Sequence, residues 1–130
     1  MALGALPAVD ATDIYYVDVG AYDVRGYGSV YILDADRPAV VDTGLGTNVD
    51  VLLDAIEEVG IDVVDAILTT HIHLDHAGGA GFLAEEFPDA TVYVHDIGVR
   101  HRVDCWLDAL GEHVIAVQQQ EVPLNVWFGL

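Results

Sequence analysis

Four side chains that could bind a metal ion lie within six consecutive positions, at His71, His73, Asp75 and His76. Imidazole nitrogens and carboxylate oxygens suit zinc, and also iron or manganese. An ion with an open coordination position would lower the pKa of a bound water to roughly 7 and so create hydroxide at neutral pH. Grouping so many titratable side chains costs desolvation unless something pairs them. The spacing therefore predicts a metal centre rather than a structural role.

A buried strand is predicted directly before this segment. Residues 63–70 have strand character, and Ala66-Ile67-Leu68 forms their apolar centre. Alternate side chains of an extended chain share a face, so His71 and His73 should project together while Ile72 points the other way.

A turn should follow the two histidines. We expect Leu74 to turn into the core, and Asp75 and His76 to lie where the next helix begins. Gly78 and Gly79 allow the backbone to bend tightly there. Asp75 and His76 should thus follow His71 and His73 on the turn that opens the next helix.

The elements that must position this loop alternate between strand and helix. Apolar residues at helical spacing predict a helix over 49–59, with Asn48 as its N-cap and Gly60 as its stop. A shorter helix over 80–87 should end at Pro88. Strand, helix, strand in this order predicts an α/β fold with a helix packed on a sheet. The expected strands are Thr12–Val19, Ser29–Leu33, Ala39–Val41, Val63–Thr70 and Thr91–His95.

Two segments carry a family resemblance. Residues 69–79, with the sequence TTHIHLDHAGG, resemble the His-x-His-x-Asp-His motif of the metallo-β-lactamase superfamily. Residues 40–44, VVDTG, resemble that family's first motif, an aspartate at a strand end before a glycine loop. The helix and strand between the two motifs fit the same order. The resemblance covers about residues 12–103, and the glyoxalase-II-like thioesterases are the nearest general analogy.

The resemblance implies a role for each matched residue. His71 and His73 would bind one zinc ion, and Asp75 and His76 a second. Asp75 would also be the catalytic residue that orients or helps to deprotonate the water between the ions. Asp42 would fix the metal loop by hydrogen bonds, as outer carboxylates commonly do, although a simple turn-forming aspartate is an equal alternative. The implied reaction is attack of metal-bound hydroxide on an ester, thioester or amide-type bond of a small molecule.

The family's fold is an αββα sandwich, with two mixed sheets between outer helices. A chain of 130 residues can hold only its N-terminal half, so we expect one partial domain over 1–130. Residues 104–130 form an atypical tail, because their composition departs from the acidic, small-residue pattern before them. We expect a truncated member whose reading frame shifts near residue 104, which intact mass and sequencing of the downstream DNA would test.

The family's later ligands have no match here. A third histidine for the first ion normally lies in a Gly-His-Thr-Pro-Gly-like segment, followed by a bridging aspartate and a last histidine. His113 lacks that context, while His95 and His101 lie too early and are better explained as ordinary polar residues. A catalytic zinc usually takes three protein ligands and a water, so four ligands for two ions are too few. We expect an incomplete centre, which a second copy or another chain could complete.

Three functions stay open at this point. The first is a metal-dependent hydrolase, active alone or completed by a partner chain. The second is a truncated metal-binding fragment without turnover. The third is an iron-dependent oxygenase of the same superfamily, since two histidines and one carboxylate can bind Fe(II).

The net charge of the chain limits the classes of molecule that it could bind. The chain has 22 acidic residues against four arginines, a formal charge of −18. Such a surface repels nucleic acid and anionic membranes, which leaves a small-molecule substrate. The acids are dispersed rather than in blocks, which is typical of a protein from a halophile with a salt-rich cytoplasm.

The remaining signals favour a cytoplasmic protein. Cys105 is the single cysteine, so no disulfide can form within the chain, as suits a reducing compartment. Residues 1–10 lack the basic start and long apolar run of a signal peptide. No stretch approaches the roughly 20 apolar residues that span a bilayer.

Overall fold

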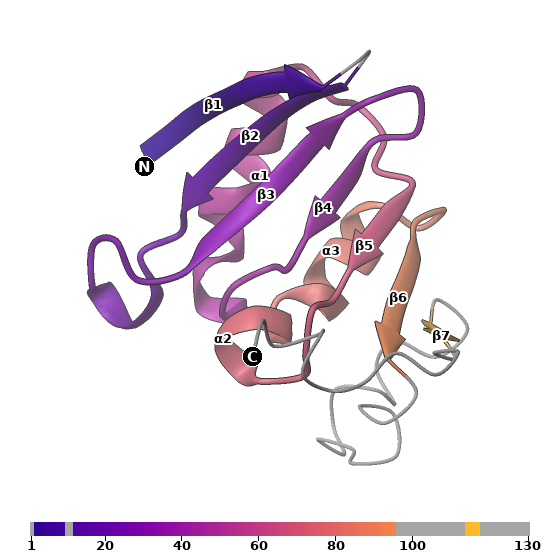
Figure 1. Cartoon of the computed structure of the whole chain (residues 1–130). Helices are drawn as coiled ribbons and strands as arrows, with labels where there is room; N and C mark the ends of the chain where they lie inside the picture. Colours follow the sequence, from indigo (N-terminus) through magenta and orange to yellow (C-terminus); the bar gives the residue numbers. More distant parts are fainter. Residues whose placement is uncertain (1, 10–11, 96–113, 118–130) are drawn as a thin grey trace, which may run out of the picture.

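One mixed sheet organises the chain (Figure 1). The computed structural model describes residues 2–9, 12–95 and 114–117, and within them seven strands pair in the order β1-β2-β3-β4-β5-β6-β7. The strands are β1 (Ala2–Val9), β2 (Thr12–Asp18), β3 (Ser29–Asp34), β4 (Ala39–Val41), β5 (Ala66–Leu68), β6 (Thr91–His95) and β7 (Val114–Val117). The helices are α1 (Val49–Val59), α2 (Leu74–Ala77) and α3 (Ala80–Glu86), with 3-10 turns η1 (Ala21–Asp23) and η2 (Gly46–Asn48).

The direction of pairing changes at β4. Strands β1 to β4 are antiparallel neighbours, whereas β4, β5, β6 and β7 pair in parallel. A parallel pair needs a crossover, and α1 supplies it between β4 and β5. The predicted α/β fold and its strand-helix-strand unit are therefore confirmed.

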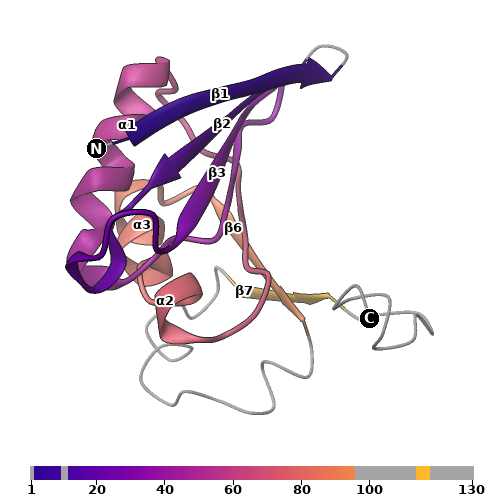
Figure 2. The same ribbon diagram turned by 60° about the vertical axis from the view of Figure 1, so that its left-hand side comes forward.

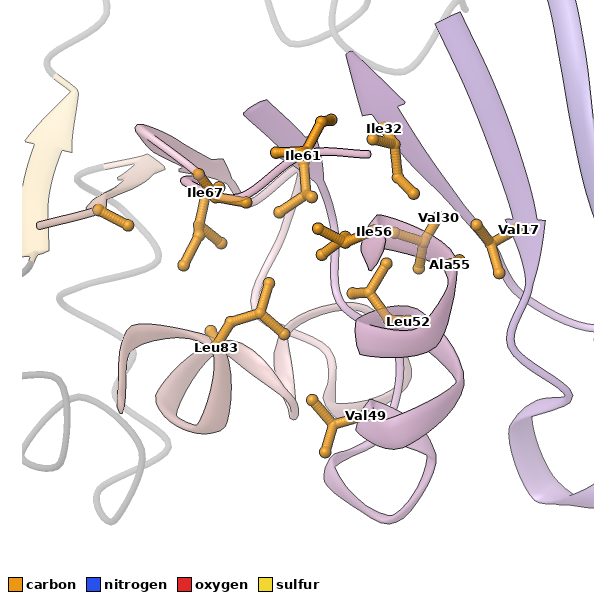
Figure 3. Packing of buried hydrophobic residues seen from close by; sticks show 14 of the residues in the cluster. Val17, Val30, Ile32, Val49, Leu52, Ala55, Ile56, Ile61, Ile67 and Leu83 are labelled. Atoms are coloured by element: carbon orange, nitrogen blue, oxygen red, sulfur yellow. The ribbon is translucent and has the colours of Figure 1, made fainter. Parts of the chain in front are cut away.

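The helices α1 and α3 both lie on one face of the sheet (Figure 2). Leu52 and Ile56 of α1 and Leu83 of α3 pack with Ile32 and Ile67 of the sheet, and all five side chains are fully buried (Figure 3). Burial of this apolar face is the main favourable term in folding of such a layer.

The opposite face of the sheet has no helix over it in the part of the chain that the structure describes (Figure 2). Tyr16 on β2 and Tyr31 on β3 are paired across the strands and are exposed. One sheet with helices on a single side is half of an αββα sandwich, as predicted.

Most predicted elements agree with the structure to within one residue, but the strand predicted over 63–70 is wrong at both ends. Only Ala66–Leu68 is strand, and Val63 is 53% exposed. The backbone N–H groups of Asp65 and Ala66 both donate to the Pro38 carbonyl, at 2.8 and 3.3 Å. These bonds form the entry to the strand, so the chain before it is a loop.

The two predicted ends of α1 differ in outcome. Gly60 stops the helix in a left-handed conformation, φ 91°, and its N–H donates to the Glu57 carbonyl at 2.9 Å. Asn48 is the N-cap residue, as predicted, but its side chain makes no capping bond. The 3-10 turn η2 leads directly into the helix, and the Asn48 side chain instead accepts a bond from the Thr47 hydroxyl at 3.3 Å.

Strand β1 was not predicted. Its sequence, ALGALPAV, is rich in alanine and contains glycine and proline, which have low strand propensity. It forms because it is an edge strand that pairs with β2 alone, where the register shifts between Leu6 and Val9 around Pro7. Proline is tolerated at such an edge.

Several predictions fall outside the described residues. They concern His101, Cys105, His113 and the atypical tail, apart from the four residues of β7. Among the described helices, none has the length and apolar character needed to cross a bilayer.

Candidate metal centre

The predicted metal loop and Asp42 meet at one edge of the sheet. Strand β4 ends at Val41 and its parallel neighbour β5 ends at Leu68, in register with each other. The carboxyl ends of parallel neighbours lie at the same edge, so the residues after each strand come together. The Asp42 N–H donates to the Leu68 carbonyl at 2.8 Å, which extends the pairing by one step.

The Asp42 carboxylate is buried, and both of its oxygens have hydrogen-bond partners. Its Oδ1 accepts the Thr70 backbone N–H at 2.8 Å, and the Thr70 hydroxyl lies 2.9 and 2.8 Å from Oδ1 and Oδ2. Its Oδ2 also lies 3.0 Å from His76 Nδ1. Asp42 holds an uncommon left-handed backbone, φ 62°, with 7% of its surface exposed. It bonds to both ends of the loop that carries the candidate ligands.

Thr43 forms a second link to the same loop. Its N–H donates to the His76 carbonyl at 2.7 Å, and its Oγ1 accepts the Gly79 N–H at 3.0 Å. Sequence reasoning gave neither Thr43 nor Thr70 a role. The signal that could have found them is their position, directly beside Asp42 and His71 where neighbouring strands end.

Gly44 should be intolerant of a side chain, because it combines a left-handed φ of 72° with close packing. A Cβ added there would lie 2.8 Å from Val19 Cγ2. We expect Gly44→Ala to lower the free energy of unfolding by about 1–2 kcal/mol for the backbone and by a further 1–3 kcal/mol for the overlap.

Gly60→Ala is the matched control for Gly44→Ala. Its φ is 91°, and an added Cβ would meet nothing within 4 Å. Chemical denaturation of both variants separates the two costs, and equal losses would show that the Val19 contact contributes nothing.

The three imidazoles of the loop cluster around His71. Its ring centroid lies 4.8 Å from that of His73 and 4.0 Å from that of His76. The predicted common direction of His71 and His73 therefore matches the geometry. His71 Nδ1 also lies 3.0 Å from the Thr70 hydroxyl.

His76 lies between two carboxylates. Its Nδ1 faces Asp42 Oδ2 at 3.0 Å, and its Nε2 lies 3.7 Å from Asp75 Oδ2. An ionised carboxylate only accepts hydrogen bonds, so His76 Nδ1 carries the proton that points to Asp42. In a neutral ring Nε2 then presents a lone pair beside the Asp75 oxygen, and two acceptors face each other.

The pKa of His71 lies below its usual value. Partial burial of the ring is the largest cause, and the neighbouring His76 and His73 add to it, while Asp42 and Asp75 oppose the change. The lowered pKa favours the neutral imidazole, which is the form that binds a metal ion.

The prediction that Leu74 turns into the core is wrong, since 59% of its surface is exposed. Residues 74–77 form the single helical turn α2, and Ala77 is its buried member. A one-turn helix buries few positions, and here the inward one is Ala77, with 1% of its surface exposed.

The donor set suits a divalent ion in kind, with three imidazoles and a carboxylate in one loop. Within the described ranges, however, no three His, Cys, Asp or Glu side chains are arranged so that they could hold a metal ion together. His95, half-buried at the end of β6, does not complete such a group. The loop therefore offers ligands without a finished site.

A cavity of about 340 Å³ lies elsewhere, lined by Asp18, Val19, Gly20, Asp23, Arg25, Asn48 and Val51. None of the candidate metal ligands lines it. The backbone N–H groups of Gly26 and Gly20 donate to Asp18 and lower the pKa of its carboxyl group. The Asp18 carboxylate therefore stabilises the loop that contains Gly20 and Gly26.

Comparison with known proteins gives a family match over most of the chain. The model of the metallo-beta-lactamase superfamily matches residues 23–115. A probable metallo-hydrolase of Methanocaldococcus jannaschii is 30% identical over 60% of this chain and 39% of its own length. A hydroxyacylglutathione hydrolase of Enterobacter sp. is 38% identical over 65% of this chain and 32% of its own.

The fold has a counterpart among solved structures. A chemotaxis sensor solved as a peroxy diiron species superposes with a TM-score of 0.68 at 18% identity, covering 91% of this chain and 46% of that one. The chain spans less than two fifths of the length of each curated relative above, and less than half of the sensor.

Proposed function

Because this chain belongs to the metallo-beta-lactamase superfamily, we propose that it is a metal-dependent hydrolase of a small molecule whose metal loop is residues 71–76. The matched relatives include a probable metallo-hydrolase and a hydroxyacylglutathione hydrolase. By analogy with the hydroxyacylglutathione hydrolase, we propose a thioester as the first substrate class to test. Simple esters and amides are the next classes.

The arrangement of His76 carries this proposal. When the ring is neutral, its Nε2 and Asp75 Oδ2 are two acceptors 3.7 Å apart, and Asp42 holds the proton on the opposite nitrogen. A divalent cation bound by both atoms would relieve this opposition and would neutralise part of a strongly acidic surface. His71 and His73 would supply nitrogens to a neighbouring ion.

Each residue has a distinct task in the proposed reaction. A bound ion would lower the pKa of a coordinated water to roughly 7. Asp75 would accept a hydrogen bond from that water and orient it. Asp42 and Thr43 would hold the loop in place, so that the ligands need no rearrangement when substrate binds.

The described residues do not complete a metal site by themselves. A catalytic zinc usually takes three protein ligands, and the loop supplies two for each of two ions. We propose that the other ligands come from outside the described residues, or from a second copy or another chain.

Elemental analysis and a hydrolysis assay test the proposal together. We expect zinc near two ions per chain in the purified protein, with turnover of a generic thioester or lactone that a chelator removes and added zinc restores. Iron in place of zinc would favour the oxygenase alternative. Absence of bound metal after incubation with zinc, iron and manganese would overturn the proposal.

A second candidate is a metal-binding module without turnover. It is favoured by the absence, among the described side chains, of a group of three that could hold an ion. Sub-stoichiometric metal without hydrolysis of either substrate would support this candidate instead.

A further inference from the structure

One hydroxyl group lies between the buried carboxylate and the first histidine of the loop. Thr70 Oγ1 is 2.9 and 2.8 Å from the two carboxylate oxygens of Asp42 and 3.0 Å from His71 Nδ1. A hydroxyl has a single proton and can accept further bonds. Only one of its two neighbours can therefore receive that proton.

The charge of the Asp42 carboxylate decides which of the two neighbours receives the hydroxyl proton. Hydrogen bonds to an ionised acceptor are stronger than those to a neutral ring nitrogen, so the Thr70 hydroxyl donates to Asp42. Its oxygen then accepts from His71, which places the His71 proton on Nδ1. The Nε2 lone pair of His71 is left free.

His76 reaches the same state by a direct bond. Its Nδ1 lies 3.0 Å from Asp42 Oδ2, so this nitrogen also carries the ring proton. The backbone N–H of Thr70 fixes the other carboxylate oxygen at 2.8 Å, which stops the carboxylate from rotating. The Asp42 carboxylate thereby determines which nitrogen carries the proton in both imidazole rings.

We propose that Thr70 is a positioning residue that relays the Asp42 carboxylate to His71, so that His71 and His76 share one tautomer and both present Nε2 to the metal loop. If the proposed function is correct, the two rings bind different ions, and the relay would then link the two metal positions. The tautomers themselves rest on the hydrogen bonds alone and hold without metal.

Nitrogen-15 NMR of the histidine rings in the metal-free protein tests the relay, at a pH where the rings are neutral. In the wild type we expect both His71 and His76 to be protonated on Nδ1. Thr70→Val should leave His76 unchanged and allow His71 to populate both tautomers, whereas Thr70→Ser should restore the wild-type pattern. Asp42→Asn should disturb both rings.

The same variants, titrated with Co(II), separate this inference from the proposed function. If metal binds, Thr70→Val should weaken it by about 10-fold or more, because outer partners of a ligand contribute on this scale, and Thr70→Ser should not. Protonation of His71 on Nε2 in the wild type would overturn the relay, and this measurement needs no variant to fold. Expected tautomers without any metal binding would instead support the relay and reject the hydrolase.

Discussion

His71→Ala should abolish tight metal binding and, with it, hydrolysis. The His71 ring is the centre of the imidazole cluster, 4.8 and 4.0 Å from its two neighbours, so its loss removes a donor nitrogen and opens the cluster to water. Removing an outer partner of a ligand costs about 10–100-fold in metal affinity, and we expect removal of a ligand to cost more than about 100-fold. Titration with Co(II), followed by its visible absorption, measures the change.

The control for His71→Ala must account for weak binding of cations to an acidic surface, because the chain carries 22 acidic residues. Glu58→Gln on the exposed side of α1 removes one charge away from the loop and should leave the tight sites unchanged. Thermal unfolding of both variants checks that they are folded. Wild-type metal content in His71→Ala would show that His71 is not a ligand.

Leu52→Ala should cause a large loss of stability. Leu52 lies on α1, has 0% of its surface exposed and packs in the cluster that joins the helix to the sheet. Truncation of a buried leucine leaves a cavity, and we expect the free energy of unfolding to fall by about 2–5 kcal/mol. Urea denaturation at fixed ionic strength measures this, since a net charge of −18 makes stability depend on salt.

Val63→Ala is the comparison for Leu52→Ala. Val63 is 53% exposed, so its truncation should change stability by less than about 0.5 kcal/mol. Losses of equal size in the two variants would contradict the placement of α1 against the sheet.

Elements whose residues show one clear period were predictable from sequence. Helix α1 was found at both bounds because its buried positions recur at helical spacing, and β6 because five residues alternate in burial. Strand β1 was missed because its sequence carries no such pattern and its pairing with β2 depends on the backbone. The single turn α2 was likewise too short for periodicity to indicate which residue faces inward.

Residue types predicted which side chains form the site better than they predicted the hydrogen bonds that hold the site together. The clustering of His71, His73 and His76 follows from their spacing at a strand end. The bonds from Asp42 to Thr70 and His76 span 28 and 34 positions, and only the parallel pairing of β4 with β5 creates them. Sequence alone could not decide between a turn-forming aspartate and one that holds the loop, because both need the same residue at the same place.

The left-handed backbone at Asp42 has a consequence for engineering. Glycine adopts φ 62° more readily than other residues, by up to roughly 1–2 kcal/mol, so the backbone alone would favour Asp42→Gly. That exchange would remove the carboxylate that bonds to both Thr70 and His76. Hydrogen bonds to a charged group contribute about 1.5–3 kcal/mol each, so their loss would outweigh the gain at the backbone, and position 42 is best held constant in any design for heat resistance.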